Sequence, residues 1–357
     1  MKFIIFAGGS GKRFWPISRV KLPKQFVPVI DGKSTIQLGI DRLKTDYGLH
    51  NIYISTNEKY VKLVKEHIPE FYTSNIITEP ARRDLAAAVG LSLVRLKKFG
   101  ITEPIFIGWA DHFIADEKQF HEKLTEAEKS IRQGEYKIVF WGEVPKNANP
   151  NLGWMKASKK DGSDVAKYED WVYRPPLEEC KKLFESREWF INTGYFITTI
   201  DYLLSIYEKH QPEIYKKLME IENAINTDKE SEVIENVYPT IESISFDEAI
   251  GYHIPKDDAG MIISDMGWED PGSLYALKKH FAPGRENYIK GKGLFSNSSD
   301  SMIFNEEDKK MIVGLDLDEV LIVNTKDVLL ITKNHSLKNL KKLLKEFEDD
   351  DELSKYL

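Results

Sequence analysis

Hydrophobic residues in the first part of the chain alternate between short continuous runs and longer stretches with helical spacing. Continuous apolar runs are typical of strands that are covered on both faces of a sheet. Such runs predict strands over residues 2–7, 51–56, 75–78, 104–109 and 137–141. Apolar positions three and four residues apart predict helices over residues 35–46, 59–67, 85–98 and 116–133. Strand and helix alternate about every 25–30 residues, which favours a doubly wound α/β sheet.

This alternation loosens after about residue 150. The pattern there predicts, in order, two strands, a helix, a strand, a mostly helical stretch and a late strand, over residues 153–157, 165–173, 177–186, 193–198, 202–225 and 259–264. Pro283 and Gly284 mark a boundary between a first domain, residues 1–282, and a second, residues 283–357. Short β-type runs in the second domain predict a small all-β appendage, over residues 301–304, 311–314, 319–324 and 328–332. A helix over residues 336–347, with Ser336 as its N-cap, closes the chain.

Composition and charge narrow the class of protein. The 357 residues carry a net charge of −7, whereas proteins that bind nucleic acid usually have a basic excess, so we expect no nucleic-acid partner. A single cysteine rules out an internal disulfide framework and a cysteine zinc cluster. The first apolar run, residues 3–7, is shorter than the roughly 7–15 residues of a signal peptide or the about 20 of a membrane helix. We therefore expect a cytoplasmic protein with no membrane partner.

A glycine-rich loop, residues 8–13, follows the first predicted strand and reads Gly-Gly-Ser-Gly-Lys-Arg. It is not a Walker A loop, because Phe6 stands where the first glycine of that motif belongs. It is not a dinucleotide-binding fingerprint, because Phe14 replaces the third glycine. Glycines let backbone N–H groups approach a phosphate closely, and Lys12 and Arg13 add positive charge. These residues alone indicate either a phosphate-binding loop or an ordinary glycine turn.

The loop belongs to a longer stretch, Ala7-Gly-Gly-Ser-Gly-Lys-Arg-Phe-Trp-Pro-Ile-Ser-Arg19, which is followed by Pro23-Lys24-Gln25-Phe26. This stretch closely resembles the opening signature of bacterial mannose-1-phosphate guanylyltransferases. Further segments resemble motifs of that family in the same order, namely Glu79-Pro80-Ala81-Arg82-Arg83-Asp84, Ala110-Asp111-His112, Asn192-Thr193-Gly194, residues 267–273 and residues 323–331. The resemblance covers nearly the whole chain.

The resemblance implies a Rossmann-like mixed sheet of the nucleotidyltransferase type, with a β-helix-like C-terminal appendage and a terminal helix. It also implies a reaction that needs Mg²⁺, in which α-D-mannose 1-phosphate attacks the α-phosphorus of GTP. GDP-mannose would form and pyrophosphate would leave. Because the attacking sugar phosphate is already an anion, catalysis would consist of positioning and charge neutralisation. Members of this family often self-associate, so a homodimer is a possible assembly.

The same resemblance implies roles for individual residues. Arg13 and Lys24 would be the catalytic cations, and Asp111 and Asp270 would hold the magnesium ion. The nucleotide would contact Gly8, Gly9, Ser10, Gly11, Lys12, Glu79 and Asp84, with the Glu79 carboxylate accepting from guanine. The sugar phosphate would contact Gly153, Tyr173, Arg174 and Asn192. The alternatives are a helix or turn cap for Asp111, a turn position before Pro271 for Asp270, and an exposed loop position for Glu79.

The sequence departs from the family pattern on the sugar side. Tyr173-Arg174-Pro175 stands where the family has Glu-Lys-Pro, and a tyrosine cannot act as a carboxylate acceptor. Residues 151–154 align with a Gly-Tyr-Gly-Tyr turn and lose one of its glycines. Trp109 replaces a proline, and Asp84-Leu85 replaces Asn-Thr. The triphosphate residues are thus retained, while the sugar pocket is altered.

Three alternatives follow from this pattern. The protein could carry out the same reaction on another sugar 1-phosphate, such as a heptose, which Tyr173 favours. It could be a catalytically silent sensor of nucleotide sugars, although such a protein would be expected to lack one of the four charged residues assigned to catalysis or metal binding. A glycosyltransferase with a related sheet would not explain the glycine loop followed by Pro-Lys-Gln-Phe.

Overall fold

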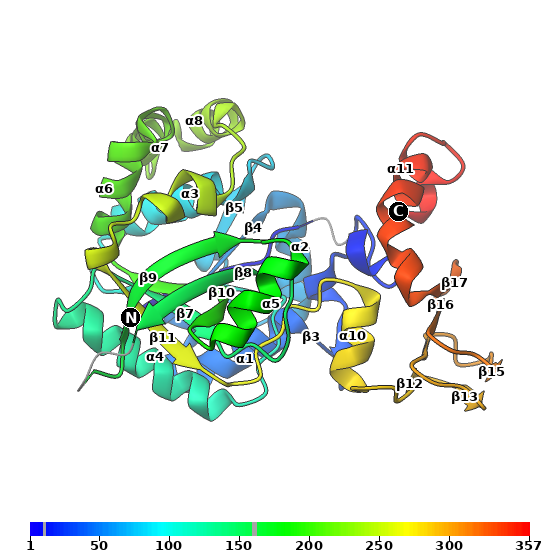
Figure 1. The fold of residues 1–357 in the computed structure, drawn as a ribbon. Helices are drawn as coiled ribbons and strands as arrows, with labels where there is room; N and C mark the ends of the chain where they lie inside the picture. The colour runs from blue at the N-terminus through cyan, green and yellow to red at the C-terminus, as the bar shows by residue number, and fades with distance from the viewer. Residues whose placement is uncertain (10–11, 159–162) are drawn as a thin grey trace. The chain divides into compact units, whose positions relative to one another are not determined.

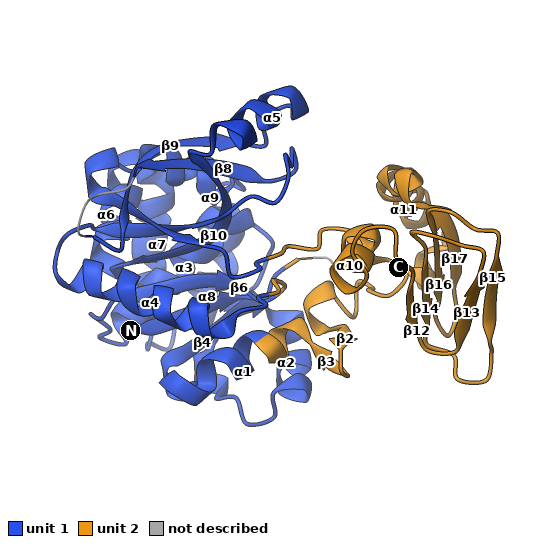
Figure 2. Ribbon diagram, turned by 60° about the horizontal axis from the view of Figure 1, so that its bottom comes forward, with its two compact units in different colours: residues 1–8, 39–110, 114–268 blue, residues 9–38, 111–113, 269–357 orange. Residues whose placement is uncertain are grey.

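The structure is a computed structural model that describes residues 1–9, 12–158 and 163–357. The chain divides into two compact units, each assembled from separate segments (Figure 2). Unit 1 comprises residues 1–8, 39–110 and 114–268, and unit 2 comprises residues 9–38, 111–113 and 269–357. Lys12 and Arg13 of the glycine loop therefore lie in the same unit as the C-terminal strands. Whether residues 1–282 fold as a domain without residues 283–357 stays a prediction.

Unit 1 is built on a nine-stranded mixed sheet. Its strands, from one edge to the other, are β5 (Ile76–Glu79), β4 (Ile52–Asn57), β1 (Lys2–Phe6), β6 (Ile105–Trp109), β10 (Trp189–Thr198), β7 (Ile138–Glu143), β11 (Ala259–Ser264), β9 (Ala166–Tyr173) and β8 (Gly153–Ser158). The first four run parallel, and β10 enters antiparallel between β6 and β7. The continuous apolar runs form these central strands because helices cover both faces of the sheet.

Helices lie on both faces of this sheet, as the alternating pattern predicted (Figure 1). The helices of unit 1 are α1 (Thr35–Tyr47, whose first turn belongs to unit 2), α2 (Val61–His67), α3 (Asp84–Lys98), α4 (Glu117–Arg132), α5 (Leu177–Ser186), α6 (Ile200–His210), α7 (Pro212–Ala224), α8 (Glu230–Val237) and α9 (Phe246–Ala249). On one face, the ring of Phe106 in β6 packs against Phe120 of α4 at 5.9 Å. On the other face, Ile4 and Phe6 of β1 join one core cluster with buried residues of α3, α6 and α7. The predicted doubly wound α/β fold is confirmed.

Unit 2 consists of short strands, two helices and residues 9–38, which follow β1 in the chain. Its elements are β2 (Pro28–Ile30), β3 (Lys33–Ser34), α10 (Leu274–Phe281), β12 (Tyr288–Lys290), β13 (Gly293–Ser296), β14 (Met302–Asn305), β15 (Ile312–Leu315), β16 (Val320–Asn324), β17 (Leu329–Lys333) and α11 (Leu340–Glu348). Strands β12, β14 and β16 pair in parallel, and β13 pairs in parallel with β15. Strands β12 to β16 thus alternate between two sheets, which is the coiled arrangement expected of a β-helix-like appendage, and β17 then pairs antiparallel with β16.

Several local predictions need correction. The stretch 202–225 is two helices, because Pro212 has no backbone N–H to continue α6 and instead begins α7. The closing helix begins at Leu340, after a 3₁₀ segment at Asn334–Asn339, and no side chain caps it, so the prediction of Ser336 as N-cap was wrong. Strands β12 and β13 were not predicted from the sequence. Every helix in the described part of the chain is too short or too polar to cross a bilayer.

The packing of α3 on α7 depends on a glycine and gives a test of the fold. A Cβ at Gly90 of α3 would lie 2.4 Å from Cδ1 of Leu218, a fully buried residue of α7. At Gly39, inside α1, a Cβ would meet no described atom within 4 Å. Gly90→Ala should destabilise the protein by about 1–3 kcal/mol through overpacking, whereas Gly39→Ala should stabilise it by up to about 1 kcal/mol through helix propensity.

Urea unfolding of the two variants and the wild-type protein measures both effects. If Gly90→Ala unfolds at the same urea concentration as Gly39→Ala, the close approach of α3 to α7 is contradicted.

Candidate functional site

A buried lysine connects two carboxylates in unit 2. The ammonium of Lys24 donates to Oδ2 of Asp111 and to Oδ1 of Asp270, at 3.0 Å in each case. The lysine side chain is 7% exposed, whereas the two aspartate side chains remain 29% and 24% exposed. Lys24 therefore compensates one of the two negative charges inside the unit, and the carboxylates keep access to the surface.

Three segments that are distant in sequence bring these groups together. Lys24 begins a 3₁₀ turn directly after Pro23, and Asp111 follows the carboxyl end of β6. Asp270 lies in the loop before α10. An antiparallel bridge aligns the two aspartate segments, because the backbone N–H groups of Phe113 and Glu269 each donate to the other's carbonyl, at 2.9 and 3.1 Å.

Arg13 completes a cluster of four charged residues. A Cβ at Gly272 would lie 3.2 Å from Nη1 of Arg13, so the guanidinium lies against the Asp270-Pro271-Gly272 turn. The four residues that the resemblance assigned to catalysis and metal binding are thus brought together within one unit. His112, which is buried, lies beside them, with its Nε2 4.0 Å from Oδ1 of Asp111.

The electrostatics of this cluster favour the charged forms. Burial by itself acts to raise the pKa of Asp111, but the charges of Lys24, His112 and Arg13 outweigh it and hold that pKa well below its usual range. Burial acts to lower the pKa of Lys24, but the two aspartates outweigh it and raise that pKa. Both partners therefore stay ionised at neutral pH, with oxygen atoms and cations arranged for a highly charged ligand.

The two carboxylates fit a magnesium ion. Mg²⁺ prefers hard oxygen ligands and is commonly held by one or two carboxylates together with substrate phosphates. Asp111 and Asp270 provide such a pair, because one oxygen of each carboxylate lies 3.0 Å from the same atom, Nζ of Lys24. Among the described residues, no group of three or more His, Cys, Asp or Glu side chains offers a complete protein-made metal site.

The glycine loop is only partly described. Around Gly8 and Gly9, a Cβ would meet no described atom within 4 Å, and Gly9 has a φ of 111°, which strongly favours glycine. Ser10 and Gly11, both predicted to bind the nucleotide, lie outside the described residues. The ammonium of Lys12 pairs with the carboxylate of Glu348 in α11, a contact that the sequence did not indicate.

A second group of predicted residues lies in unit 1, at the end of β5. The hydroxyl of Tyr238 donates to Oε2 of Glu79 at 2.5 Å. Burial raises the pKa of Glu79, although the bond from Tyr238 and the charge of Arg82 act to lower it. Asp84 begins α3 with a φ of 61°, and its Oδ1 accepts from the backbone N–H of Leu85 at 2.8 Å. Asp84 therefore starts the helix, as well as being a candidate ligand-binding residue.

The predicted sugar-phosphate residues also come together in unit 1. Gly153 in β8 pairs with Tyr173 in β9, and a Cβ at Gly153 would lie 3.4 Å from Cβ of Asn192 in β10. The guanidinium of Arg174 lies 5.0 Å from the centre of the Tyr173 ring, and Arg174 has a φ of 47°. Three strands, together with the residue that follows β9, thus bring these four residues close together.

Two neighbouring residues were not predicted. Asp247 of α9 is half-buried and lies among the charges of Arg174, Glu248 and Asp84, and burial raises its pKa. The indole Nε1 of Trp171 is buried beside Gly153, with no hydrogen-bond partner in the described part of the chain. A capping-box pattern, Ser245 to Glu248, could have revealed α9 and hence Asp247. No comparable pattern marks Trp171.

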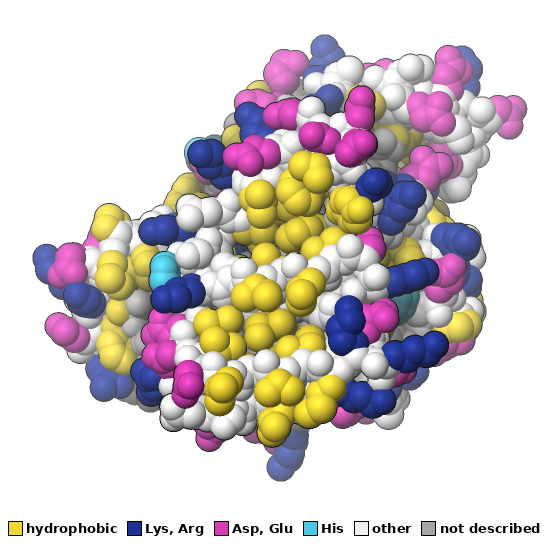
Figure 3. All heavy atoms as spheres, turned by 90° about the vertical axis from the view of Figure 1, so that its right-hand side faces the viewer, with side chains coloured by type: hydrophobic (Ala, Val, Ile, Leu, Met, Phe, Trp, Pro, Cys, Tyr) yellow, Lys and Arg dark blue, Asp and Glu magenta, His cyan; other side chains and the backbone are white. Residues whose placement is uncertain are grey.

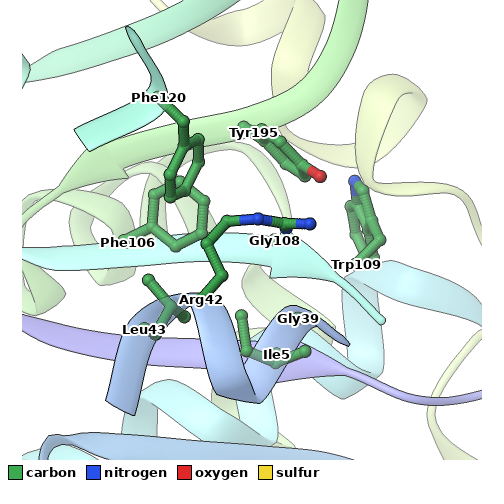
Figure 4. A pocket seen from close by; sticks show the side chains of 9 residues that line it. All are labelled: Ile5, Gly39, Arg42, Leu43, Phe106, Gly108, Trp109, Phe120 and Tyr195. Carbon is green, nitrogen blue, oxygen red and sulfur yellow. The ribbon is translucent and has the colours of Figure 1, made fainter. Parts of the chain in front are cut away.

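Unit 1 also contains a small hollow that is separate from the predicted site residues. It lies beside α1, where the Arg42 guanidinium points toward Gly108, between Tyr195 and Trp109 (Figure 4). None of the predicted site residues lines it. Trp109, which departs from the family pattern, packs there against Gly194, where a Cβ would lie 2.4 Å from the indole nitrogen. The glycine of Asn192-Thr193-Gly194 is thus explained by packing and by a φ of 77°.

Comparisons with known proteins agree with the fold and with the resemblance. The family model described as Nucleotidyl transferase matches residues 2–283. Mannose-1-phosphate guanylyltransferases of Salmonella typhimurium strain LT2 and Escherichia coli strain K12 are each 28% identical to this chain. The first alignment covers 98% of this chain and 72% of the relative, and the second covers 97% and 73%.

Solved structures support the same architecture. A crystal structure named as mannose-1-phosphate geranyltransferase from Thermus thermophilus has a TM-score of 0.85 and 20% identity. It covers 97% of this chain and 99% of its own. At that identity the likeness concerns the fold, and it confirms a nucleotidyltransferase architecture that includes the C-terminal strands. With a family model that matches most of its length, this chain belongs to the nucleotidyl transferase family and is a nucleotidyltransferase enzyme.

Proposed function

We propose that this enzyme transfers GMP from GTP to α-D-mannose 1-phosphate and releases pyrophosphate, giving GDP-mannose. The observation that carries this proposal is the cluster of Lys24 with Asp111 and Asp270, to which Arg13 is added. A reaction between two anionic substrates needs cations of this kind. The names of the curated relatives support the choice of mannose and of guanylate.

The chemistry is a direct displacement at the α-phosphorus of GTP. An oxygen of the sugar phosphate forms the new P–O bond, and the bond to the β-phosphate oxygen breaks, with its electron pair leaving on pyrophosphate. No proton transfer is needed. Lys24 neutralises the α-phosphate oxygens, and Arg13 binds the leaving pyrophosphate through its paired N–H groups. A Mg²⁺ ion held by Asp111 and Asp270 would supply further neutralisation of the phosphate oxygens.

Glu79 is the residue that we assign to the base. Guanine presents N1–H and N2–H₂ as neighbouring donors, and one ionised carboxylate can accept from both. The hydrogen bond from Tyr238 fixes one carboxylate oxygen and so orients the group. Asp84, with Gly8 to Lys12, completes the proposed nucleotide contacts.

The sugar phosphate is assigned to Gly153, Tyr173, Arg174 and Asn192. Arg174 can bind the phosphate, whereas Tyr173 offers a hydroxyl where a carboxylate acceptor would otherwise stand. For this reason a second candidate substrate is another sugar 1-phosphate of related configuration, such as a heptose. A silent sensor is disfavoured, because all four charged residues of the unit 2 cluster are present and adjacent.

The setting of the reaction also remains a proposal. We assign the enzyme to the cytoplasm, where nucleoside triphosphates and sugar phosphates are made and used. We propose no nucleic-acid partner, since the net charge of −7 disfavours binding to a polyanion.

Release of pyrophosphate in the presence of Mg²⁺, measured with a panel of nucleotides and sugar phosphates, tests the proposed function. We expect release with GTP and mannose 1-phosphate. If pyrophosphate is released with GTP and a different sugar 1-phosphate, but not with mannose 1-phosphate, that other sugar phosphate is the substrate. No release with any pair, in a preparation that binds GTP, would contradict the proposed reaction.

The charged cluster should be required for turnover. Lys24→Gln should lower kcat by about 10²–10³-fold, because it removes the cation at the α-phosphate. Lys21, three residues earlier and exposed, provides the matched control, and Lys21→Gln should retain wild-type kcat. Steady-state pyrophosphate release measures kcat for both variants, and circular dichroism verifies that both are folded. Equal kcat values for the two variants would rule out the role assigned to Lys24.

Binding of GTP should depend on pH through Glu79. Because burial raises its pKa, the carboxylate is ionised above that raised value and becomes protonated as the pH falls through it. Affinity for GTP should therefore decline as the pH falls through that raised value. Tyr238→Phe removes a bond that favours the ionised form, so the decline should begin at a higher pH.

Calorimetric titration of GTP at a series of acidic pH values measures this shift. Tyr72→Phe, at an exposed position, serves as the control and should behave like the wild-type protein. Identical pH profiles for Tyr238→Phe and the control would show that Tyr238 does not act on the base-reading carboxylate.

A further inference from the structure

The predicted sugar-phosphate residues of unit 1 offer few groups that can accept a hydrogen bond from a sugar. A sugar ring presents several hydroxyl donors, and one ionised carboxylate can accept from two of them. Arg174 has no acceptor atom, and Tyr173 has only a neutral hydroxyl. Oδ1 of Asn192 already accepts from the backbone N–H of Gly194 at 2.8 Å. The apolar side chains exposed on the C-terminal strands, visible as a hydrophobic area on one face (Figure 3), offer no acceptor either. The missing group is therefore a carboxylate close to Arg174.

Helix α9, which carries Asp247, is held beside the start of α3. The backbone N–H of Ala86, in the first turn of α3, donates at 3.3 Å to the carbonyl of Ile244, which lies just before α9. Asp84 is the first residue of α3 and one of the proposed nucleotide contacts. Burial, and to a smaller extent the charges of Glu248 and Asp84, act to raise the pKa of Asp247. The carboxylate of Asp247 therefore lies near a residue assigned to the nucleotide.

The same helix packs on the two strands that carry Tyr173 and Asn192. The ring of Phe246 in α9 stacks on Phe196 of β10, with ring centres 5.1 Å apart and an angle of 13° between the planes. A Cβ at Gly251, just after α9, would lie 2.9 Å from Cζ3 of Trp171 in β9. These contacts fix α9 against β9 and β10 as well as against α3.

The local fold of α9 does not depend on the carboxylate of Asp247. Ser245 caps this helix by accepting from the backbone N–H of Glu248 at 3.2 Å. Among the described residues, the carboxylate of Asp247 forms no ion pair, and its hydrogen bond comes from its own backbone N–H. The charge of Arg174 acts on it to lower its pKa, but burial outweighs that charge. A half-buried carboxylate without a direct counter-charge is costly for the fold and is typical of a residue that binds a ligand.

We propose that Asp247 accepts hydrogen bonds from two neighbouring hydroxyl groups of the sugar, and that it thereby determines which sugar 1-phosphates are used. This inference rests on the proposed function, in which Arg174 binds the phosphate of the same substrate. A carboxylate next to Arg174 can reach the sugar ring while the guanidinium holds the phosphate. Asp247 thus provides, from α9, the charged acceptor that Tyr173 does not provide from β9. No bond to Asp247 forms and no proton is transferred, so its effect is on the binding of the sugar.

Calorimetric titration of the full chain with GDP-mannose and with GDP separates the sugar from the nucleotide. The wild-type protein should bind GDP-mannose more tightly than GDP. Asp247→Asn should weaken binding of GDP-mannose by about 10–100-fold, because it removes a charged acceptor, and should leave binding of GDP unchanged. Asp247→Glu, which keeps a carboxylate, should recover part of the lost affinity. Glu248→Gln removes an exposed charge from the same helix and is the matched control, which should bind both ligands like the wild-type protein.

Steady-state kinetics provide a second measurement, in which Asp247→Asn should raise the KM for the sugar 1-phosphate but not the KM for GTP. Equal affinity of wild-type protein and Asp247→Asn for GDP-mannose overturns the proposal. An equal loss of affinity for GDP and GDP-mannose also overturns it, because a displaced α9 would act on both ligands. A wild-type protein that binds GDP-mannose no more tightly than GDP overturns it as well. If no substrate pair releases pyrophosphate but GDP-mannose binding still requires Asp247, the proposed reaction fails and the role of Asp247 in sugar binding stands.

Discussion

The ammonium of Lys24, held between Asp111 and Asp270, is the interaction on which the candidate site depends. A lysine that is 7% exposed would be strongly destabilising without a counter-charge, and two adjacent carboxylates would repel each other without a cation. Removing one member of such a buried pair typically costs about 3–5 kcal/mol. The same arrangement that stabilises unit 2 therefore keeps the carboxylates ionised and in place before any substrate binds.

The backbone around this cluster explains why unit 2 contains both the site and the C-terminal strands. Phe14, directly after Arg13, lies in one hydrophobic cluster with Phe113, Leu274, Met302 and Phe304. Residues that flank the charged cluster therefore pack against β14 of the C-terminal strands. The strands predicted as an appendage are, in the structure, part of the packing that supports Arg13, Lys24, Asp111 and Asp270.

The sequence was sufficient to predict those features of the structure that depend on a local pattern of residues. The strands and helices of the main sheet were predictable because both faces are covered and the apolar runs are unbroken. Arg13, Lys24, Asp111 and Asp270 were found because they lie in motifs with a recognisable order. Tyr238 could not be found this way, since the hydrogen bond that links it to Glu79 spans 159 residues of sequence. The pairing of Lys12 with Glu348 depends likewise on the packing of α11, which no local pattern specifies.

The proposed function requires Asp111 and Asp270 to form, with the triphosphate, a single divalent-cation site. Binding of Mn²⁺ in place of Mg²⁺, followed by electron paramagnetic resonance with and without GTP, tests it most directly. In the wild-type protein, GTP should create tight Mn²⁺ binding, and Asp111→Asn should weaken that binding by at least about 10-fold. If Asp111→Asn binds Mn²⁺ in the presence of GTP as tightly as the wild-type protein, Asp111 is not a metal ligand and the two-aspartate site is wrong.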